Sequence, residues 1–188
     1  MSNVFEESSN NDYKFSVDEE VYMEKLRKSV KEKADYDLRA IIGISQRFKD
    51  KVATNQKNEY GDVVEDWDKL TTKDLISFYT EASAWDFFST PIKMQAFIES
   101  SLADIVYKYE FNSIISDPDL KGTVASKTAM AELDTLEKKF ASTYRKLYSN
   151  YVEEVTRSFG FYIHRIEKVI NWRQIDERSN PNRNPFSK

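Results

Sequence analysis

An apolar repeat without a break for almost fifty residues is the feature that most restricts the fold of this chain. Apolar side chains recur at steps of three or four, and no proline follows Pro118 until Pro181. Such steps bring side chains to one face of an α-helix. We therefore predict one helix over residues 123–175, ~70 Å long at 1.5 Å per residue. Its apolar stripe consists of Leu133, Leu136, Phe140, Tyr144, Leu147, Tyr151, Val155, Phe159, Tyr162, Ile166 and Val169.

The N-terminal part also has helical spacing. Ser16 and Glu19 stand three residues apart, which is the spacing of a capping box, and the apolar positions that follow continue to Val52. We predict a helix over residues 16–53, eased at Gly43. Residues 1–15 are polar and without periodicity, and are predicted to form a disordered tail.

The middle of the chain is predicted to hold a loop and two helices. Residues 54–71 contain Gly61 and a cluster of acids, which indicates an acidic loop. Residues 72–117 read as a helical pair, because Thr90 before Pro91 resembles an N-cap followed by the favoured first helical position. Residues 177–188 are a polar tail. With only 4 Gly and 4 Pro in 188 residues, the fold class is all-α, with long helices in an extended bundle or coiled-coil-like arrangement.

Composition excludes several classes of function. The chain has no Cys and one His, which leaves no thiolate chemistry and no usual zinc ligand set. No Gly-rich phosphate loop and no nucleophile motif is present, so we predict that the protein is not an enzyme and needs no cofactor or metal. No apolar run approaches a membrane span, and the acidic, polar start differs from a signal peptide. We expect a cytoplasmic protein.

The long helix is predicted to mediate self-assembly. A helix of this length overhangs the core that the remaining residues could form, so part of its stripe would pack on another copy. The interface residues would be Tyr151, Val155, Phe159, Tyr162 and Ile166. Alternatively, the helix over residues 16–53 covers most of the stripe within the same chain.

A line of cations follows the opposite side of the same helix. Lys139, Lys146, Arg157, His164 and Lys168 lie within about 40° of one another at 100° per residue. Arg165 and Arg173 lie to the side, and Phe161 and Trp172 could stack on unpaired bases. Such a line can follow a phosphate backbone, although a solvated helix face is the alternative interpretation.

Charge is divided unevenly along the chain. Residues 138–188 hold 11 Lys and Arg against 5 Asp and Glu, a balance of +6, whereas residues 1–137 hold 17 against 27, a balance of −10. This asymmetry suggests that the C-terminal part meets a polyanion, unless the surface segregates its charges without a function.

The C-terminal half carries a family resemblance. The segments "TVASKTAMAELDTLEKKF" and "VTRSFGFYIHRIEKV" include Thr123, Val124, Asp134, Thr135, Ser158, Gly160, Phe161, Ile163 and Ile166. In this spacing they resemble the UvsY family of phage recombination mediators, over about 50 residues from Gly122 to Trp172. The resemblance implies a helical homo-oligomer that binds single-stranded DNA weakly and loads a RecA-like recombinase onto strands covered by single-strand-binding protein. It also adds Gly160 and Ile163 to the expected subunit interface.

Two functional hypotheses remain open at this point. The first is an oligomeric accessory protein that binds single-stranded DNA and assists recombination, repair or replication. The second is a structural or assembly protein, such as a virion component or a scaffold, without nucleic-acid binding. The acidic first 137 residues favour the second, because acidic surface repels DNA unless it is turned away.

Overall fold

A computed structural model describes the backbone of residues 17–179 and the side chains of residues 21–179. Apart from one small β-hairpin this part of the chain is helical, which confirms the predicted all-α class. The predicted tail 1–15, the predicted cap at Ser16 and residues 180–188 lie outside the described residues, while residues 177–179 end the last helix. The elements are α1 (Val17–Asp37), α2 (Arg39–Val52), β1 (Ala53–Lys57), β2 (Val63–Glu65), the 3-10 turn η1 (Trp67–Lys69), α3 (Thr72–Ile115), α4 (Val124–Asp134) and α5 (Leu136–Ser179).

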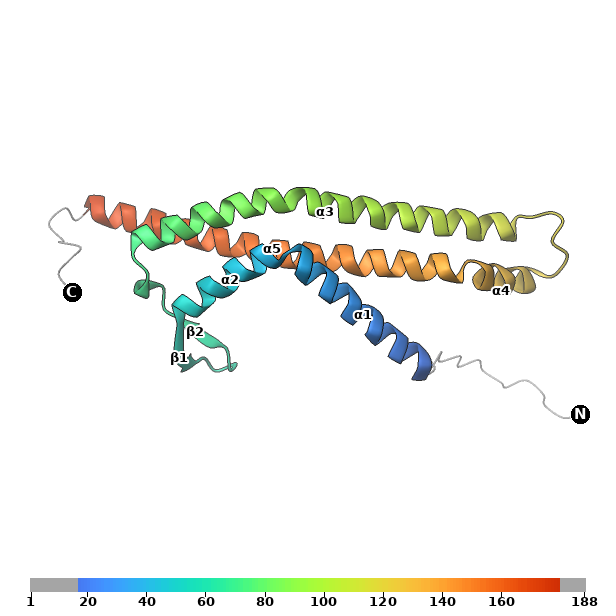
Figure 1. Cartoon of the computed structure of the whole chain (residues 1–188), viewed down its shortest axis with the longest axis horizontal. Coiled ribbons are helices and arrows are strands. Elements are labelled where there is room, and N and C mark those ends of the chain that lie inside the picture. The colour runs from blue at the N-terminus through green and yellow to red at the C-terminus, as the bar shows by residue number, and fades with distance from the viewer. Residues whose placement is uncertain (1–16, 180–188) are drawn as a thin grey trace, which may run out of the picture.

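Two long helices form the body of the molecule. α3 and α5 run antiparallel along its full length, and α4 lies beside the far end of α3 (Figure 1). The predicted 123–175 helix is divided at Thr135, which has φ −98° and ψ 8°. Its hydroxyl and its backbone N–H both donate to the carbonyl oxygen of Ala131, at 2.5 Å and 3.0 Å, and a hydroxyl bond of this kind often bends a helix. The single predicted helix is therefore α4 followed by α5.

α3 is one helix where two were predicted. It starts at a capping box in which Thr71 and Asp74 exchange hydrogen bonds, and Pro91 lies in its interior. The helix continues because its inner face packs without interruption. Leu75, Ala82, Ser89 and Ala96, spaced by seven, are all buried. Three of these four side chains are small, which lets a neighbouring helix approach closely.

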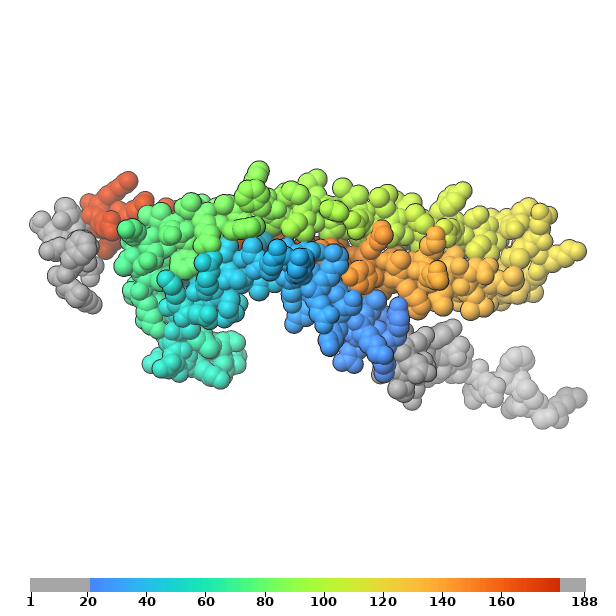
Figure 2. Space-filling view, in the orientation of Figure 1, coloured from blue at the N-terminus to red at the C-terminus, as the bar shows by residue number. Residues whose placement is uncertain are grey.

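The N-terminal helix bends at Leu38 and not at Gly43. Leu38 has φ −103° and ψ 12°, and it is 1% exposed because the bend inserts its side chain into the core. α1 and α2 thus form an arch beside α5 (Figure 1), and the space-filling view shows a hollow between α1 and the β-hairpin (Figure 2).

The predicted acidic loop contains a β-hairpin, so this part of the prediction is wrong. β1 and β2 pair antiparallel, and the turn between them is closed by the side chain of Asn58. Its carbonyl oxygen accepts from the backbone N–H groups of Tyr60 at 3.0 Å and Asp62 at 2.8 Å. Gly61 in this turn has φ 84°, a conformation that favours glycine.

The core consists of two clusters on the inner side of α5. One lies under the arch and includes Leu38, Ala82 and Phe159, and the other surrounds Phe48 and Ile166 near the β-hairpin. Phe159 and Ile166 are each 2% exposed, so residues of their own chain cover them. Their assignment to a subunit interface is therefore wrong. The remaining predicted interface residues, all half-buried, are Tyr151, Val155, Gly160, Tyr162 and Ile163.

Gly160 does not bring two segments close together within the chain. A Cβ atom built on it would meet nothing within 4 Å outside its own helix backbone. The close packing between subunits that the resemblance implied for Gly160 thus has no counterpart inside the described chain, and it stays a prediction about a second copy.

Candidate nucleic-acid interface

The outer face of α5 carries most of the predicted nucleic-acid residues. Because the buried residues of α5, such as Val152 and Ile166, gather on one side, the opposite side of the helix is free of intramolecular packing. The α5 outer face, as we use the term, consists of Lys139, Lys146, Arg157, Phe161, His164, Lys168 and Trp172, all of which are exposed.

Cations and aromatics lie closest together in the C-terminal third of this face. From Arg157 to Trp172 the five members of the face span about 80° around the helix axis and ~22 Å along it. Phe161 and Trp172 are 65% and 64% exposed, although both are large apolar side chains. Exposed rings between cations offer a stacking surface next to phosphate contacts. Glu153 and Glu154 separate this group from Lys146 and Lys139, which are more remote.

The histidine on this face has an acidic neighbour. Nδ1 of His164 lies 3.6 Å from Oε2 of Glu167, one helical turn further along. Arg157 and Lys168, in contrast, form no ion pair with any side chain among residues 21–179. These two side chains are therefore the cations of the group that are available to an anionic ligand.

Arg165 and Arg173 do not belong to this surface, which corrects their assignment. Arg165 forms an ion pair with Glu65 at 3.2 Å and lies over the ring of Trp67, 5.0 Å from its centroid. Arg173 donates to the carbonyl oxygens of Leu70 at 2.6 Å and Trp67 at 2.9 Å. Both arginines thus hold the segment after the β-hairpin against α5.

Two tyrosines fix the position of α5 against the bend between α1 and α2. The hydroxyl of Tyr148 donates to Asp37 at 2.6 Å, and that of Tyr151 donates to Asp35 at 2.9 Å. Burial and then the bond to the carboxylate raise the pKa of Tyr148 far above its ordinary value, and the same two causes raise the pKa of Tyr151 to about 12. Burial alone would raise the pKa of Asp37, but hydrogen bonds from Tyr148 and Lys33 hold it below its ordinary value.

Replacing Tyr148 by Phe should lower the free energy of unfolding by about 1–2 kcal/mol, because a hydrogen bond to a carboxylate is lost and Asp37 stays partly buried. Urea denaturation measures this loss. The control is Tyr109→Phe, since Tyr109 is 75% exposed.

The folded-state pKa values of Tyr148 and Tyr151 are both raised. The contribution of these two tyrosines to the free energy of unfolding is therefore complete below pH ~10 and is lost as the pH rises towards 12. A stability that is equal at pH 9 and pH 11.5 in the wild type would contradict this account.

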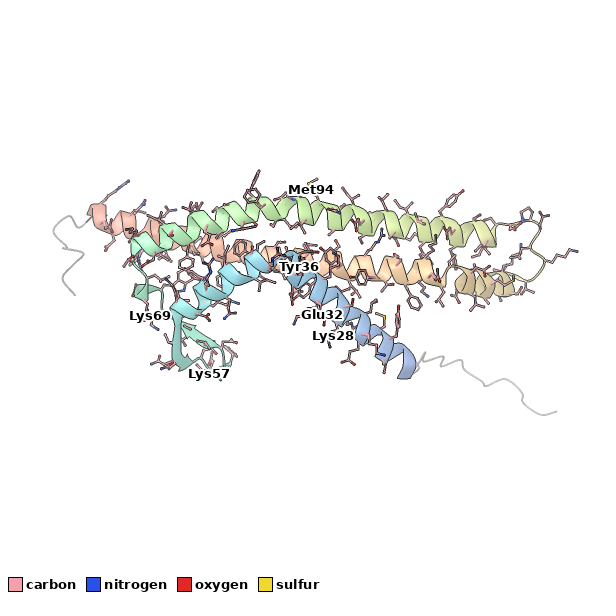
Figure 3. All side chains as sticks on the ribbon, in the orientation of Figure 1. Lys28, Glu32, Tyr36, Lys57, Lys69 and Met94 are labelled. Atoms are coloured by element: carbon pink, nitrogen blue, oxygen red, sulfur yellow. The ribbon has the colours of Figure 1, made fainter. Side chains whose placement is uncertain are left out.

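A second exposed surface, on α3, was not predicted. Trp85 and Phe88 are large apolar side chains, yet they are 41% and 62% exposed. A row of mostly apolar residues follows the outer side of α3, with sequence spacings that alternate between four and three. This α3 seam consists of Phe87, Pro91, Met94, Ile98, Ser101 and Ile105. Figure 3 shows Met94 on the upper edge of α3, where it also borders a pocket with Ser149 and Glu153 of α5.

Other kinds of site find no support in the described part of the chain. No three His, Asp or Glu side chains among the described residues are placed to hold a metal ion. None of the helices between residues 17 and 179 has a stretch both long and apolar enough to cross a membrane. No protein-family model, curated protein or solved structure matches the chain. The resemblance to UvsY proteins therefore stays a prediction.

Proposed function

We propose that the protein is a non-enzymatic accessory protein that binds single-stranded DNA along the C-terminal third of the α5 outer face. Arg157 and Lys168 would contact phosphates, His164 would add a contact when protonated, and Phe161 and Trp172 would stack on bases. Lys146 and Lys139 would extend the track for a longer strand. The RecA-like recombinase and the single-strand-binding protein implied by the resemblance are partners that we propose on that basis alone.

One observation carries this proposal. Phe161, between Arg157 and Lys168, and Trp172, one turn beyond Lys168, are about two-thirds exposed, and these two cations have no ion-pair partner among the described side chains. Exposed aromatic rings are unfavourable on a helix face that only contacts water, because exposing apolar surface to water costs free energy. Unpaired bases offer them flat apolar partners, and a single strand adds the phosphates that match the cations.

The double variant Arg157→Ala/Lys168→Ala should bind oligo-dT about 10- to 100-fold more weakly than the wild type at low salt. Each phosphate neutralised on a single strand contributes about 0.7 to the slope of log K against log salt. The slope should therefore become less steep by about 1.4. Fluorescence anisotropy of labelled oligo-dT over a range of salt concentrations measures both quantities.

A matched control removes one arginine and one lysine from a different surface of the molecule. Arg27→Ala/Lys31→Ala removes one arginine and one lysine from the exposed side of α1, and should leave affinity and slope close to those of the wild type. Equal losses in the two variants would mean that net charge alone governs binding, and an unchanged affinity in the first variant would refute the proposed site.

A helical interaction protein without nucleic-acid binding is the second candidate. It is favoured by the exposed apolar residues of α3, among which Phe87 is 74% exposed. Failure of the wild type to bind oligo-dT even at low salt, where phosphate contacts are strongest, would support this second function.

A further inference from the structure

The outer side of α3 is free of charge over most of its length. Between Lys73 and Lys108 every charged residue of the helix lies about 100° or more around the axis from the centre of the α3 seam. These residues are Asp74, Glu81, Asp86, Lys93, Glu99 and Asp104. Charged residues make up 32% of the chain, so a solvent-facing side without any is unusual for this protein. Sides of surface helices that face water are normally polar or charged.

The apolar area on this side matches the requirement of a protein interface. Three aromatic side chains on or beside the seam are 67–75% exposed, namely Phe87, Phe97 and Tyr109. At about 150–250 Å² per aromatic side chain they expose roughly 300–550 Å². Met94, Ile98, Leu102 and Ile105, each at least half exposed, add to this area. The total approaches the ~800 Å² that each partner contributes to a standard interface, and exceeds the patches of ordinary monomers.

The spacing of the seam selects a helix as its partner. Alternating steps of four and three form the seam of a coiled coil, in which each side chain inserts between residues of a facing helix. α5 already occupies the inner side of α3, so this second seam has no partner within the described chain. The α3 seam of a second copy can cover this seam. Under a twofold axis the two subunits bury the same surface against each other.

The order of residues along the seam distinguishes the two possible orientations. In a parallel pair each residue meets its own copy, and the next position after Ile105 would bring Lys108 against Lys108. In an antiparallel pair centred between Met94 and Ile98, Phe87 faces Ile105, Met94 faces Ile98 and Pro91 faces Ser101. In both orientations every large apolar side chain meets an apolar one, so Lys108 makes the difference: in the antiparallel pair it lies beyond the last pair, opposite Ala84, and meets no second lysine.

We propose that two copies of this chain associate through the α3 seam, with the two α3 helices antiparallel and the twofold axis between Met94 and Ile98. The interface lies on α3 and not on the α5 stripe where the sequence placed it. The inference is independent of the DNA site, because it concerns a different helix and is tested without nucleic acid.

Light scattering after size exclusion tests the interface directly. The wild type should have twice the 22.1 kDa mass of one chain. Ile98→Glu should raise the dissociation constant at least ~100-fold, because each dimer would bury two glutamates near the axis. The control Ile175→Glu introduces the same change at a site that is 62% exposed on α5, and should leave the dimer intact. Both sites are at least half exposed, so helix content by circular dichroism should equal that of the wild type.

Two results would overturn the interface. One is a wild type that stays monomeric at high concentration, which would mean that the α3 seam does not bind a second copy of the chain. The other is an Ile98→Glu variant with the mass of the wild type.

Disulfide trapping tests the orientation of the two helices. The chain has no native cysteine, so only the introduced cysteines can form disulfides. A mixture of the variants Phe87→Cys and Ile105→Cys should form a mixed disulfide on mild oxidation, because these positions face each other only in the antiparallel pair. In a parallel pair they would be ~27 Å apart along the axis. Phe87→Cys alone should not form a disulfide-linked dimer. If it does so efficiently, while the mixture gives no mixed product, the antiparallel arrangement is wrong.

Discussion

Replacing Phe48 by Ala should lower the free energy of unfolding by about 3–5 kcal/mol, the usual cost of removing a large aromatic side chain from a core. Phe48 is 2% exposed and joins three segments of the chain. Its ring centroid lies 4.9 Å from that of Trp67, 5.3 Å from that of Phe78 and 6.2 Å from that of Tyr162. The cavity would thus loosen η1, α3 and α5 together.

Urea denaturation followed by circular dichroism measures this loss. Phe161→Ala removes the same side chain from a position that is 65% exposed, and should change the free energy of unfolding by about 0.5 kcal/mol or less. In oligo-dT binding the two variants should behave in the opposite way, with a loss only for Phe161→Ala. A small effect of Phe48→Ala on stability would mean that the cluster around the β-hairpin is not part of the core.

Replacing Arg173 by Ala should lower the free energy of unfolding by about 2–3 kcal/mol, since hydrogen bonds from a charged donor are lost at two backbone carbonyls. The Arg173 side chain is 15% exposed, and its two bonds fasten the residues between the β-hairpin and α3 to the last turns of α5. Arg173→Lys should recover only part of the loss, because an ammonium group cannot reproduce the two-pronged geometry of guanidinium.

Arg157→Ala is the control for this prediction. Arg157 is exposed on the same helix, so its removal should change stability by about 0.5 kcal/mol or less while weakening DNA binding. Arg173→Ala, measured at a temperature where it remains folded, should keep the DNA affinity of the wild type. If Arg173→Ala loses as much affinity as Arg157→Ala, Arg173 contacts DNA and its purely structural role is wrong.

Helix positions were the part of the fold that the sequence could predict, because periodicity is a local property. The stripe from Leu133 to Val169 correctly indicated a helix along almost the whole C-terminal third. From Phe140 onwards its side that packs inwards was also correct, as the burial of Phe159 and Ile166 demonstrates, whereas Leu133 and Leu136 are 72% and 42% exposed. Which segment covers that stripe was open, and α3 covers most of it within the same chain, with the arch of α1 and α2 covering the rest.

The breaks between helices were predicted poorly because tertiary packing decides them. Pro91 resembles a helix start in sequence, yet the row of small buried residues on α3 carries the helix past it. Leu38 gives no local signal for a bend. The chain bends there because this apolar side chain is buried at the place where the arch meets α5.

The candidate site shows the same limit. Helical angles correctly grouped Arg157, Phe161, His164 and Lys168 on one exposed face. They could not reveal that Arg165 and Arg173 are engaged by residues 65–70, about a hundred positions earlier in the chain. The α3 seam, in contrast, had a signal in the sequence, since its alternating spacing and its lack of charge are both visible there.

The fluorescence of Trp172 provides the most direct test of the proposed DNA site. The chain has 3 Trp, so Trp67→Phe/Trp85→Phe leaves Trp172 as the only indole. Stacking on a base should quench its emission as oligo-dT is added, and high salt should restore it. A matched variant that keeps only Trp85, made by Trp67→Phe/Trp172→Phe, should show no change in emission at an oligo-dT concentration that saturates that variant. Emission from Trp172 that stays constant while anisotropy reports saturated binding would place the DNA elsewhere and contradict the proposed site.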